Sequence, residues 1–379
     1  MVARALTVVQ MVPELDSGGV ERGTLEIGRY LIQHGHRSIV ISGGGRLVGQ
    51  LESEGSEHLL WEVGKKSPMT LRFVPRLKKF LSQQKVDILH LRSRVPAWVG
   101  YLAWKNMPEH ARPRLVTTFH GFYSVNRYSA VMANGEKVIA ISEVIKQHII
   151  DNYNIPPARI EMIHRGFDQA KFTPSSVTGE EVEYWVKKWN LAEERPPVIM
   201  LPGRLTRLKG HDVFINALKI IEDLHWQALC VGDFDEKSGY FNELQQALRD
   251  LQINKRVMFV GHCDNMPVAY KLSDIVVSAT STKPEAFGRI AVEALAMERP
   301  VIASAQGGSM ETVLPGKTGW LVEPKDPGSL ADALREAILH PDICRKYGES
   351  GRNWVLENFT TEKMCHKTVE LYRCLIFKS

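Results

Sequence analysis

The chain has 379 residues, which is too long for one ordinary core and about right for two α/β domains of typical size. Its composition, 44% hydrophobic and 24% charged, is that of a globular protein and excludes the disordered and fibrous classes. The net charge of +5 is uneven, because residues 1–170 hold 22 Lys and Arg against 15 Asp and Glu while the remainder carries −2. A basic first half fits nucleic acid, an anionic membrane surface or simple solvation. We expect no nucleic-acid partner.

No apolar stretch approaches the ~18 residues that a membrane-spanning helix needs. The apolar start over residues 5–12 contains Gln10 and is followed by Pro13, so we expect no signal peptide and no transmembrane segment. The cysteines are odd in number and never spaced as CxxC, which argues against a disulfide framework and a zinc site and fits a cytoplasmic protein. They are Cys230, Cys263, Cys344, Cys365 and Cys374.

The first half of the chain alternates short β-branched runs with helical patterns. A run over residues 5–12 is followed by a helix over residues 20–31 with one apolar face, and then by a second run over residues 38–41. This alternation predicts a parallel, doubly wound sheet. Further strands are expected over residues 86–90, 115–119, 138–141 and 160–163.

A basic helix is predicted over residues 71–81, where apolar residues recur at helical spacing beside four cations. Two interpretations fit this pattern. One is contact with an anionic membrane surface, which would place the protein peripherally on the inner face of the cytoplasmic membrane, and the other is a solvated helix face. The cations are Arg72, Arg76, Lys78 and Lys79.

A polar stretch over residues 174–179 leads into a Trp-containing helix and then to Arg195, Pro196 and Pro197, and we place the inter-domain connection here. We expect a first domain over residues 1–170 and a second over residues 171–360, with a helix over residues 361–379 packing back on the first. Strands of the second domain are expected over residues 198–201, 228–231, 257–260, 275–278 and 301–303, and late helices over residues 342–357 and 362–376.

Open α/β sheets bind ligands beyond the carboxyl ends of their strands, where helix N-termini attract anions. The first turn of this kind, Asp-Ser-Gly-Gly over residues 16–19, contains Gly18 and Gly19. Paired glycines permit positive φ and let a phosphate or sugar approach the backbone closely. The turn lacks the GxGxxG spacing of a dinucleotide fingerprint, so an ordinary glycine turn is an equal alternative.

A second turn places His120 at the carboxyl end of a strand, followed by Gly121. A histidine there can contact a ligand, and a buried histidine satisfied by its neighbours is the alternative.

A third turn runs from Gly203 to Gly210 and carries Arg204 and Lys209. Arg204 can offer a planar fork and Lys209 a point charge to a diphosphate, each charge-assisted hydrogen bond being worth ~1.5–3 kcal/mol. A solvated basic loop is the alternative.

A fourth turn holds Glu285 and Glu293, with seven residues between them across a loop-to-helix junction. We expect the helix to begin near Phe287, with Glu285 in the loop before it and Glu293 nearly two turns inside. One carboxylate would accept from sugar hydroxyls and the other from a ribose diol, while the amides of Phe287, Gly288 and Arg289 face a phosphate. Ordinary surface charge near a helix start is the alternative.

These turns resemble glycosyltransferase family four, and the resemblance runs through nearly the whole chain. The two glutamates separated by seven residues, Glu285 and Glu293, are the signature of that family. The other matching elements are its pyrophosphate pair (Arg204 and Lys209), its first glycine loop (Gly18 and Gly19), its active-site histidine turn (residues 118–121) and two late segments (residues 307–311 and 318–322).

The resemblance implies an α/β protein of the GT-B fold, in which two Rossmann-like, doubly wound domains face a central cleft. It implies a retaining, metal-independent transfer of a sugar from a UDP- or GDP-sugar to a hydroxyl of a glycan or lipid-linked acceptor. The first domain would bind the acceptor and the second the donor, with no cofactor besides this donor substrate. Bacterial envelope polysaccharide or lipopolysaccharide synthesis is the expected setting.

The resemblance also implies roles for individual residues. The catalytic residues would be His120, Glu285, Arg204 and Lys209. The residues that bind the nucleotide sugar would be Gly18, Gly19, Arg204, Lys209, Phe287, Gly288, Arg289 and Glu293.

Two segments depart from the family pattern. Residues 164–168 read His-Arg-Gly-Phe-Asp where members often have Pro-Asn-Gly-Val-Asp, so Arg165 stands in place of the usual Asn. Asp233 and Asp235 superficially match the DxD metal motif of the other major glycosyltransferase fold. They follow the strand over residues 228–231, where the family has a Gly-Asp turn, so we predict no required metal.

Other functions use the same fold. A sugar-nucleotide epimerase, a sugar phosphorylase or a non-catalytic carbohydrate-binding subunit would each carry similar turns. Release of nucleoside diphosphate from the donor distinguishes a transferase from an epimerase and from a binding subunit. A nicotinamide dehydrogenase is disfavoured, because GxGxxG is missing.

Overall fold

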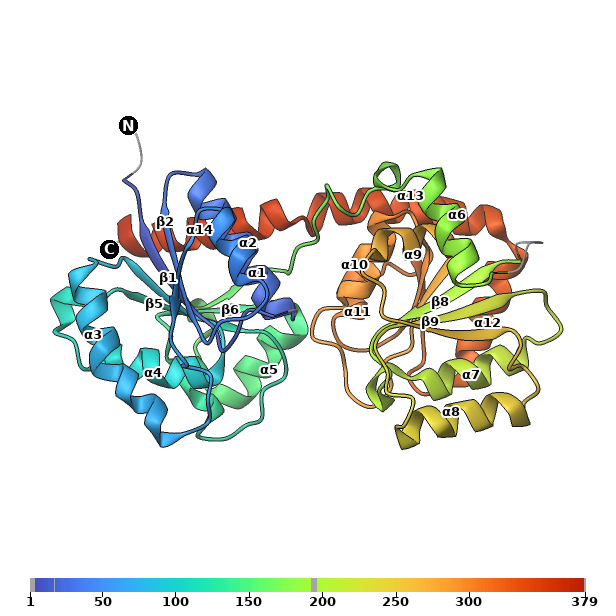
Figure 1. The fold of residues 1–379 in the computed structure, drawn as a ribbon, viewed down its shortest axis with the longest axis horizontal. Helices are drawn as coiled ribbons and strands as arrows, with labels where there is room; N and C mark the ends of the chain where they lie inside the picture. Colours follow the sequence, from blue (N-terminus) through green and yellow to red (C-terminus); the bar gives the residue numbers. More distant parts are fainter. Residues whose placement is uncertain (1–3, 17, 192–195, 378–379) are drawn as a thin grey trace. The chain divides into compact units, whose positions relative to one another are not determined.

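A computed structural model of the protein describes residues 4–16, 18–191 and 196–377. It separates into two compact units, the first formed by Met1–Gly166 with Thr361–Ser379 and the second by Phe167–Thr360 (Figure 1). Ser17 of the glycine turn and Arg195 of the predicted connection lie outside the described residues.

The first unit is built on a 7-stranded sheet with the order β3-β2-β1-β4-β5-β6-β7, in which every pair of neighbours is parallel. The predicted doubly wound sheet is therefore confirmed for this unit. Strand β3 was missed, because its sequence Glu-His-Leu-Leu has no β-branched residue and none of its side chains is buried. The strands are β1 (Thr7–Met11), β2 (Arg37–Ser42), β3 (Glu57–Leu60), β4 (Ile88–Leu91), β5 (Arg114–Phe119), β6 (Lys137–Ala140) and β7 (Ile160–Met162).

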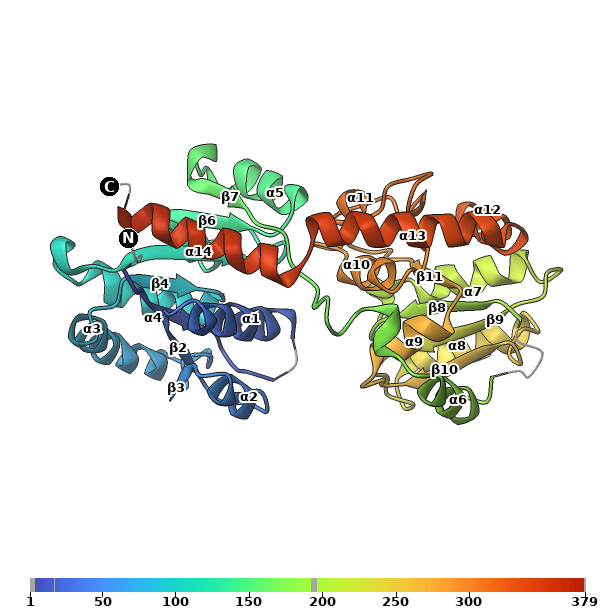
Figure 2. The same ribbon diagram turned by 90° about the horizontal axis from the view of Figure 1, so that it is seen from above.

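Helices cover both faces of this sheet. Helix α14, the last of the chain, lies alongside α1 (Figure 2), and Met364, Val369 and Tyr372 of α14 pack with Ile27 and Leu31 of α1 in one buried cluster. Each such side chain contributes ~1.5–3 kcal/mol of burial, so α14 is part of the core of the first unit. The main helices are α1 (Gly19–Gln33), α2 (Val48–Ser53), α3 (Phe73–Gln83), α4 (Arg94–Lys105), α5 (Glu143–Tyr153) and α14 (Thr361–Phe377).

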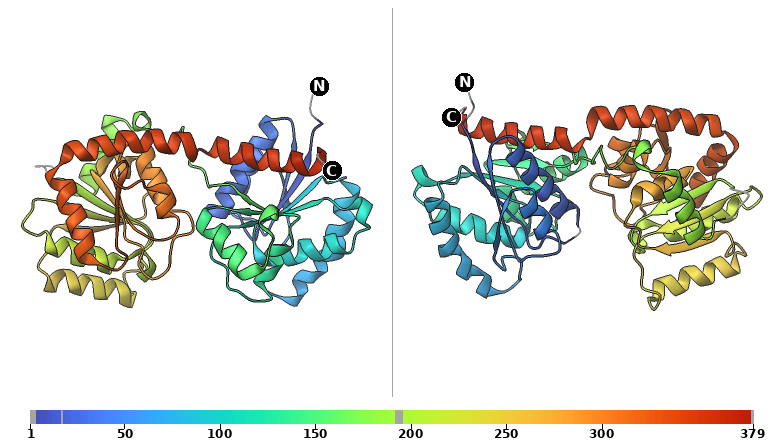
Figure 3. Two further views of the ribbon diagram at one scale, coloured as in Figure 1. Left: turned by 180° about the vertical axis from the view of Figure 1, so that it is seen from behind. Right: turned by 45° about the horizontal axis from the view of Figure 1, so that its top comes forward.

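The second unit repeats this architecture with a 6-stranded parallel sheet of order β10-β9-β8-β11-β12-β13. Figure 3 shows helices on both sides of its strands. The strands are β8 (Val198–Pro202), β9 (Gln227–Val231), β10 (Val257–Gly261), β11 (Ile275–Ser278), β12 (Val301–Ser304) and β13 (Gly319–Val322). The helices are α6 (Gly179–Lys188), α7 (His211–Ile220), α8 (Gly239–Asp250), α9 (Met266–Leu272), α10 (Arg289–Ala296), α11 (Ser309–Thr312), α12 (Pro327–Leu339) and α13 (Pro341–Asn358).

The chain passes between the units twice, after Gly166 and before Thr361. The two crossing segments are joined, because the amide of Phe167 donates to the carbonyl of Phe359 at 2.9 Å. Residues 174–191, where the sequence placed the start of the connection, lie inside the second unit. Helix α6 is tied there by a hydrogen bond of 3.0 Å from Asn265 to Glu181.

The strand orders define where ligands can bind. In each sheet the order reverses at one place, between β1 and β4 in the first unit and between β8 and β11 in the second. Loops on either side of such a switch point diverge and leave a crevice beyond the carboxyl ends of the strands. We therefore expect ligands to bind near the loops after β1, β4, β8 and β11.

The basic segment over residues 71–81 is not a single helix. It comprises the end of a 3₁₀ turn (Pro68–Arg72) and most of α3, whose Leu77 and Leu81 are buried. The apolar stripe of α3 thus faces the core of the first unit and leaves only the polar side to solvent. Among the helices of the described residues, none is both long and apolar enough to cross a membrane. Exposed on this segment are Arg72, Arg76, Lys78 and Lys79.

Candidate functional site

The loop after β8 in the second unit is held against the loop after β11 by close backbone contact. Gly210 has φ +70°, and a Cβ there would lie 1.8 Å from the carbonyl oxygen of Ala279. The amide of Ser281 donates to the carbonyl of Leu208 at 3.0 Å. The two loops on either side of the switch point therefore pack directly against each other, and this close contact requires glycine at position 210.

The predicted cations of this loop have different surroundings. Arg204 is exposed, and its side chain makes no hydrogen bond or ion pair with any described residue. Lys209 is largely buried and forms an ion pair with Glu285. The loop's third cation, Arg207, pairs with Glu243 at 2.6 Å and lies over the ring of Tyr240. The structure thus brings Lys209 and Glu285 together, and it leaves the charge of Arg204 unneutralised.

Only one carboxylate oxygen of Glu285 has a hydrogen-bond partner among the described residues. Its Oε1 accepts from Nζ of Lys209, whereas its Oε2 is buried and has no hydrogen-bond partner among the described residues. An unsatisfied buried polar atom costs ~1–3 kcal/mol, so a ligand that brings a hydroxyl to Oε2 would recover that free energy.

Two glycines from a third loop allow the Glu285 segment its position. A Cβ on Gly307 would lie 2.2 Å from the carbonyl oxygen of Glu285, and one on Gly308 would lie 2.3 Å from Cα of Phe287. The amide of Gly308 also donates to the carbonyl of Glu285 at 2.8 Å. Residues 307–308, which the sequence analysis noted only by resemblance, therefore hold the backbone of Glu285 in place.

Helix α10 begins at Arg289, two residues later than predicted, because Gly288 before it has φ +78° and cannot continue a helix. Glu293 is consequently just over one turn inside the helix, and the prediction of nearly two turns is wrong. The side chain of Phe287 is buried and packs edge-on against Phe359, with ring centroids 5.7 Å apart. The side chain of Phe287 is therefore part of the packing of the second unit.

Glu293 is buried, with both carboxylate oxygens already hydrogen bonded. Its Oε1 accepts from Nε of Arg289 at 3.0 Å, and its Oε2 accepts from the hydroxyl of Tyr270 at 3.2 Å. Burial and the charge of Glu293 raise the pKa of Tyr270 well above its usual value, so the tyrosine remains a donor. Each carboxylate oxygen has a second lone pair that can still accept from a ligand hydroxyl.

Asp233 and Asp235 lie after β9 and make separate contacts. Oδ1 of Asp233 is 3.1 Å from Nδ1 of His262, whereas Oδ1 of Asp235 accepts from the amide of Lys237 at 2.9 Å. Within the described ranges, no group of three His, Cys, Asp or Glu side chains is arranged to hold a metal ion.

In the first unit, Gly18 caps the N-terminus of α1 and Gly19 is its first residue. Gly18 has φ −77° and ψ 168°, which any residue can adopt, so it does not use the positive φ that its turn permits. A Cβ on Gly18 would lie 2.2 Å from Oε2 of Glu21, a flexible side chain that can move. The carbonyl of Gly19 accepts a hydrogen bond from Arg165.

His120 follows β5, as predicted, and is partnered on one side only. Nη1 of Arg165 lies 3.3 Å from its Nδ1, while its Nε2 is buried and has no hydrogen-bond partner among the described residues. Burial, with the charges of Arg92 and Arg165 and the neighbouring His90, holds the pKa of His120 well below its usual value. The imidazole is therefore neutral at neutral pH.

A buried polar network under His120 escaped the sequence analysis. His90 of β4 hydrogen bonds through Nδ1 to the hydroxyl of Tyr372 at 2.6 Å and through Nε2 to Thr118 at 2.7 Å. Arg92, just after β4, is buried and donates to Gln10 at 3.2 Å. Arg92 could have been predicted from its position at the carboxyl end of the strand beside β1. The pairing of His90 with Tyr372 could not, because 282 residues separate the two.

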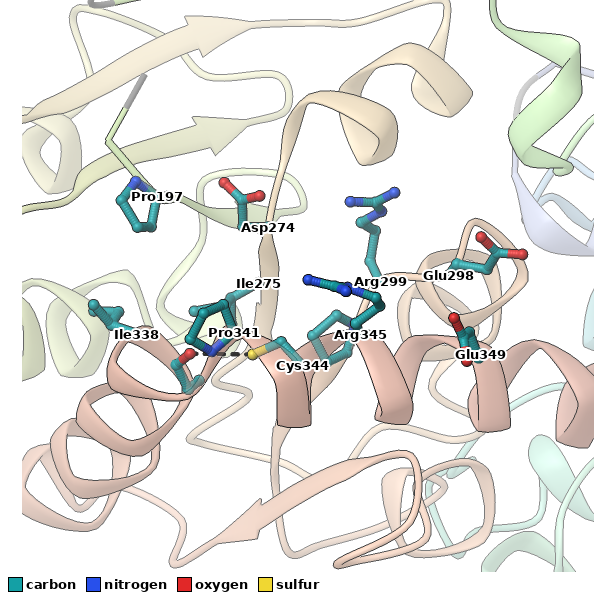
Figure 4. Close-up of a pocket in the computed structure, with 12 residues that line it drawn as sticks. Pro197, Asp274, Ile275, Glu298, Arg299, Ile338, Pro341, Cys344, Arg345 and Glu349 are labelled. Carbon is teal, nitrogen blue, oxygen red and sulfur yellow. Dashed lines mark hydrogen bonds between the residues drawn. The ribbon is translucent and has the colours of Figure 1, made fainter. Parts of the chain in front are cut away.

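A different cavity, of about 430 Å³, lies in the second unit at the opposite ends of its strands. Pro197, Asp274 and Pro300, which precede β8, β11 and β12, line it together with residues from α12 and α13 (Figure 4). Cys344 there donates to the carbonyl of Ala337 at 3.2 Å. None of the predicted site residues lines this cavity, and amino ends of parallel strands are not where such sheets bind ligands.

Known proteins resemble this chain over nearly its whole length. Two family models match, Glycosyltransferase Family 4 over residues 17–171 and Glycosyl transferases group 1 over residues 183–354. The crystal structure of a glycosyltransferase from Rickettsia africae ESF-5 is 35% identical, with a TM-score of 0.91, over 99% of this chain and 100% of that one. The chain belongs to glycosyltransferase family four. The predicted family and the α/β GT-B fold are confirmed.

More distant relatives are similar to this family-four glycosyltransferase along nearly the whole chain. The N-acetyl-α-D-glucosaminyl L-malate synthase of Bacillus anthracis is 24% identical over 95% of this chain and 94% of that protein. Anabaena Alr3699/HepE, solved in complex with UDP and glucose, is 21% identical, with a TM-score of 0.79, over 97% of this chain and 99% of that one.

The packing around Arg165 generates a test at Gly23 of α1. A Cβ there would lie 2.8 Å from Nη1 of Arg165 and 3.0 Å from Nη2 of Arg92. We expect Gly23→Ala to destabilise the first unit by ~1–3 kcal/mol, since overpacking outweighs the ~1 kcal/mol that alanine adds to helix propensity. Urea unfolding measures this. Gly49→Ala in α2, where a Cβ has nothing within 4 Å, is the control and should be neutral or stabilising. Equal stability of the two variants would contradict the packing.

Proposed function

We propose that this glycosyltransferase moves a sugar from a nucleoside-diphosphate sugar to a hydroxyl of a glycan or lipid-linked acceptor, with retention of configuration and without a metal. The arrangement of Arg204, Lys209 and Glu285 at the switch point of the second unit carries the proposal. The guanidinium of Arg204, which is exposed and pairs with no described residue, lies in the same loop as a lysine that is already oriented by a carboxylate. A diphosphate would supply an anionic partner for Arg204, and the sugar attached to it would supply a hydroxyl for Oε2 of Glu285.

The charges serve different parts of the donor. Arg204 and Lys209 neutralise the negative charge that develops on the leaving diphosphate, an electrostatic effect whose loss typically costs ~10²–10³ in rate. Oε2 of Glu285 accepts from a hydroxyl of the transferred sugar. Because Lys209 occupies Oε1 of Glu285, this carboxylate is poorly suited to act as a nucleophile. We therefore propose a front-face reaction in which an oxygen of the departing phosphate takes the acceptor proton.

The names of related proteins support a nucleotide-sugar donor. Anabaena Alr3699/HepE has been solved with UDP-glucose, and a phosphatidylinositol monomannoside mannosyltransferase of Mycobacterium tuberculosis, 29% identical over 58% of this chain, is named as GDP-mannose-dependent. We propose a UDP- or GDP-sugar for this chain. Bacterial envelope polysaccharide or lipopolysaccharide synthesis is the setting we propose, and the fold shared with WaaG, a glycosyltransferase involved in lipopolysaccharide biosynthesis, is compatible with it.

The first unit offers a groove suited to an acceptor. A hollow of about 440 Å³ is lined by two aromatic residues, Trp98 and Tyr128, together with Lys65, Lys66 and Leu71. Aromatic faces and lysines together fit a sugar or lipid-linked group that bears negative charge. We propose that the acceptor binds here.

The basic surface of α3 is proposed to dock on an anionic membrane. Arg72, Arg76, Lys78 and Lys79 are exposed, and beside them Leu60 and Met69 expose about two-thirds of their surface, 68% and 66%. Because Leu77 and Leu81 face the core, docking depends on charge and a few apolar contacts, and no helix face inserts. The protein would then be cytoplasmic and peripheral.

The diphosphate assignment predicts a large kinetic effect with a small stability effect. We expect Arg204→Ala and Lys209→Ala each to lower turnover ~10²–10³-fold while cooperative melting is retained, because these side chains act on the donor and not on the core. Arg207→Ala is the matched control, since this cation of the same loop is paired with Glu243, and it should keep most of the activity. Activity loss that merely follows loss of folding would overturn the assignment.

Independence from metal is tested by chelation. We expect turnover to persist in EDTA, since two basic side chains and the N-terminus of α10 can balance the diphosphate charge. Turnover that EDTA abolishes and Mn²⁺ or Mg²⁺ restores would instead support a metal role for Asp233 and Asp235.

Membrane docking is tested by co-sedimentation with vesicles that contain anionic lipid. We expect binding that weakens steeply with salt, because each basic residue near such a surface contributes ~1 kcal/mol within a Debye length. Reversing the four charges of the α3 segment should abolish it. Reversal of four exposed lysines of the second unit, with the same change in net charge, is the control and should leave binding largely intact. Failure of the wild type to bind at low salt would contradict docking. The control lysines are Lys237, Lys255, Lys317 and Lys325.

A further inference from the structure

We propose that Arg165 is a positioning residue that holds His120 in the tautomer protonated at Nε2, and thereby makes this histidine a neutral hydrogen-bond donor toward substrate. The part of this inference that concerns substrate rests on the proposed function. The part that concerns the tautomer rests on the geometry of the first unit alone. It gives a role to the arginine that replaces the family's usual asparagine.

The direction of one hydrogen bond decides the tautomer. Nη1 of Arg165 lies 3.3 Å from Nδ1 of His120. A guanidinium carries only donors and is not deprotonated in proteins, so Nδ1 must present its lone pair. A neutral imidazole with a lone pair on Nδ1 carries its hydrogen on Nε2. The other ring nitrogen, Nε2, is therefore a hydrogen-bond donor.

Arg165 is itself held by a second hydrogen bond from the same guanidinium. Its Nη2 donates to the carbonyl of Gly19, at the start of α1, and only 7% of the residue is exposed. Gly23, one turn further along α1, leaves room for the guanidinium, since a Cβ there would come within 2.8 Å of it. A shorter asparagine at position 165 cannot span from α1 to the end of β5. The arginine thus couples the glycine turn to the histidine turn, two elements that lie far apart in sequence.

The Nε2–H group of His120 has no hydrogen-bond acceptor within the described part of the chain. Nε2 of His120 is buried and lacks a hydrogen-bond partner there. Buried donors are almost always satisfied in native proteins, so an orphaned one indicates a ligand atom. The chemistry of an N–H selects an oxygen with a lone pair, a sugar hydroxyl or an anionic oxygen, and disfavours a cationic or apolar group.

The surroundings keep the ring neutral. Arg92 and Arg165 face it from the segments after β4 and β7, His90 from β4, and Tyr123 accompanies it in its own loop. Glu26 of α1 and the hydroxyl of Tyr372 from α14 reach the same network, where they oppose the desolvation of Arg92. Two buried guanidinium charges close to the ring disfavour a third, so imidazolium does not form in the neutral range.

The test reads the tautomer directly, in the full-length chain labelled with ¹⁵N-histidine. Long-range ¹H–¹⁵N correlation spectra distinguish the Nε2–H, Nδ1–H and imidazolium forms, and His120→Gln assigns the signal. We expect the wild type to show Nε2–H from pH 5.5 to 8 without titrating. In Arg165→Asn we expect a mixture of tautomers and a His120 that titrates nearer the ordinary pKa of ~6.5. Glycosyl transfer should fall at least tenfold in the same variant.

A matched control and a second variant keep the outcome decisive. Arg159→Asn removes another partly buried arginine of the first unit, which donates to the carbonyl of Ala133 at 3.0 Å, and it should leave the His120 signal unchanged. Arg165→Lys retains the charge without the fork, so it should keep His120 neutral while loosening the tautomer. A wild-type signal of the Nδ1–H form, or an unaltered signal in folded Arg165→Asn, would overturn the proposal. Because these spectra need no donor sugar, a failure of the proposed transferase reaction would be recognised separately.

Discussion

The contact between Gly210 and the carbonyl of Ala279 determines the site of the second unit. Only a residue without a Cβ lets the loop after β8 come this close to the end of β11. The contact places Lys209, the preceding residue, beside Glu285 of the loop after β11, and Gly307 and Gly308 support that loop from the other side. A semi-buried ion pair of this kind adds little to stability, because desolvation offsets much of its attraction. Its presence at a switch point is better explained by ligand binding than by folding.

Much of the fold was predictable because it depends on local patterns. Buried parallel strands need β-branched apolar runs, and eleven of the runs proposed from sequence match described strands, whereas β3 and β13 were missed. Strand β3 has no buried side chain. In β13, Gly319 and Trp320 replace the β-branched residues by which a buried strand is recognised. The start of α10 was misplaced because the sequence does not reveal that Gly288 adopts a left-handed conformation.

The candidate site was predictable as a set of turns but not as a set of contacts. Motif spacing identified Arg204, Lys209, Glu285 and His120, whose assignments to substrate stay predictions. Spacing carried no information that Lys209 would meet Glu285, 76 residues away, or that both oxygens of Glu293 would be engaged within the chain. Arg165 was visible only as a departure from a pattern. Its role depends on α1 and β5, which tertiary structure alone brings together.

The central claim is that Arg204 and Lys209 form the diphosphate site. Thermal shift with a panel of UDP- and GDP-sugars tests it most directly, comparing the wild type with Arg204→Ala/Lys209→Ala. At a concentration ~100 times its dissociation constant, the correct donor should stabilise the wild type by ~2.7 kcal/mol and the double variant far less. Equal stabilisation of both proteins, or no stabilisation of the wild type by any nucleoside-diphosphate sugar, would contradict the account.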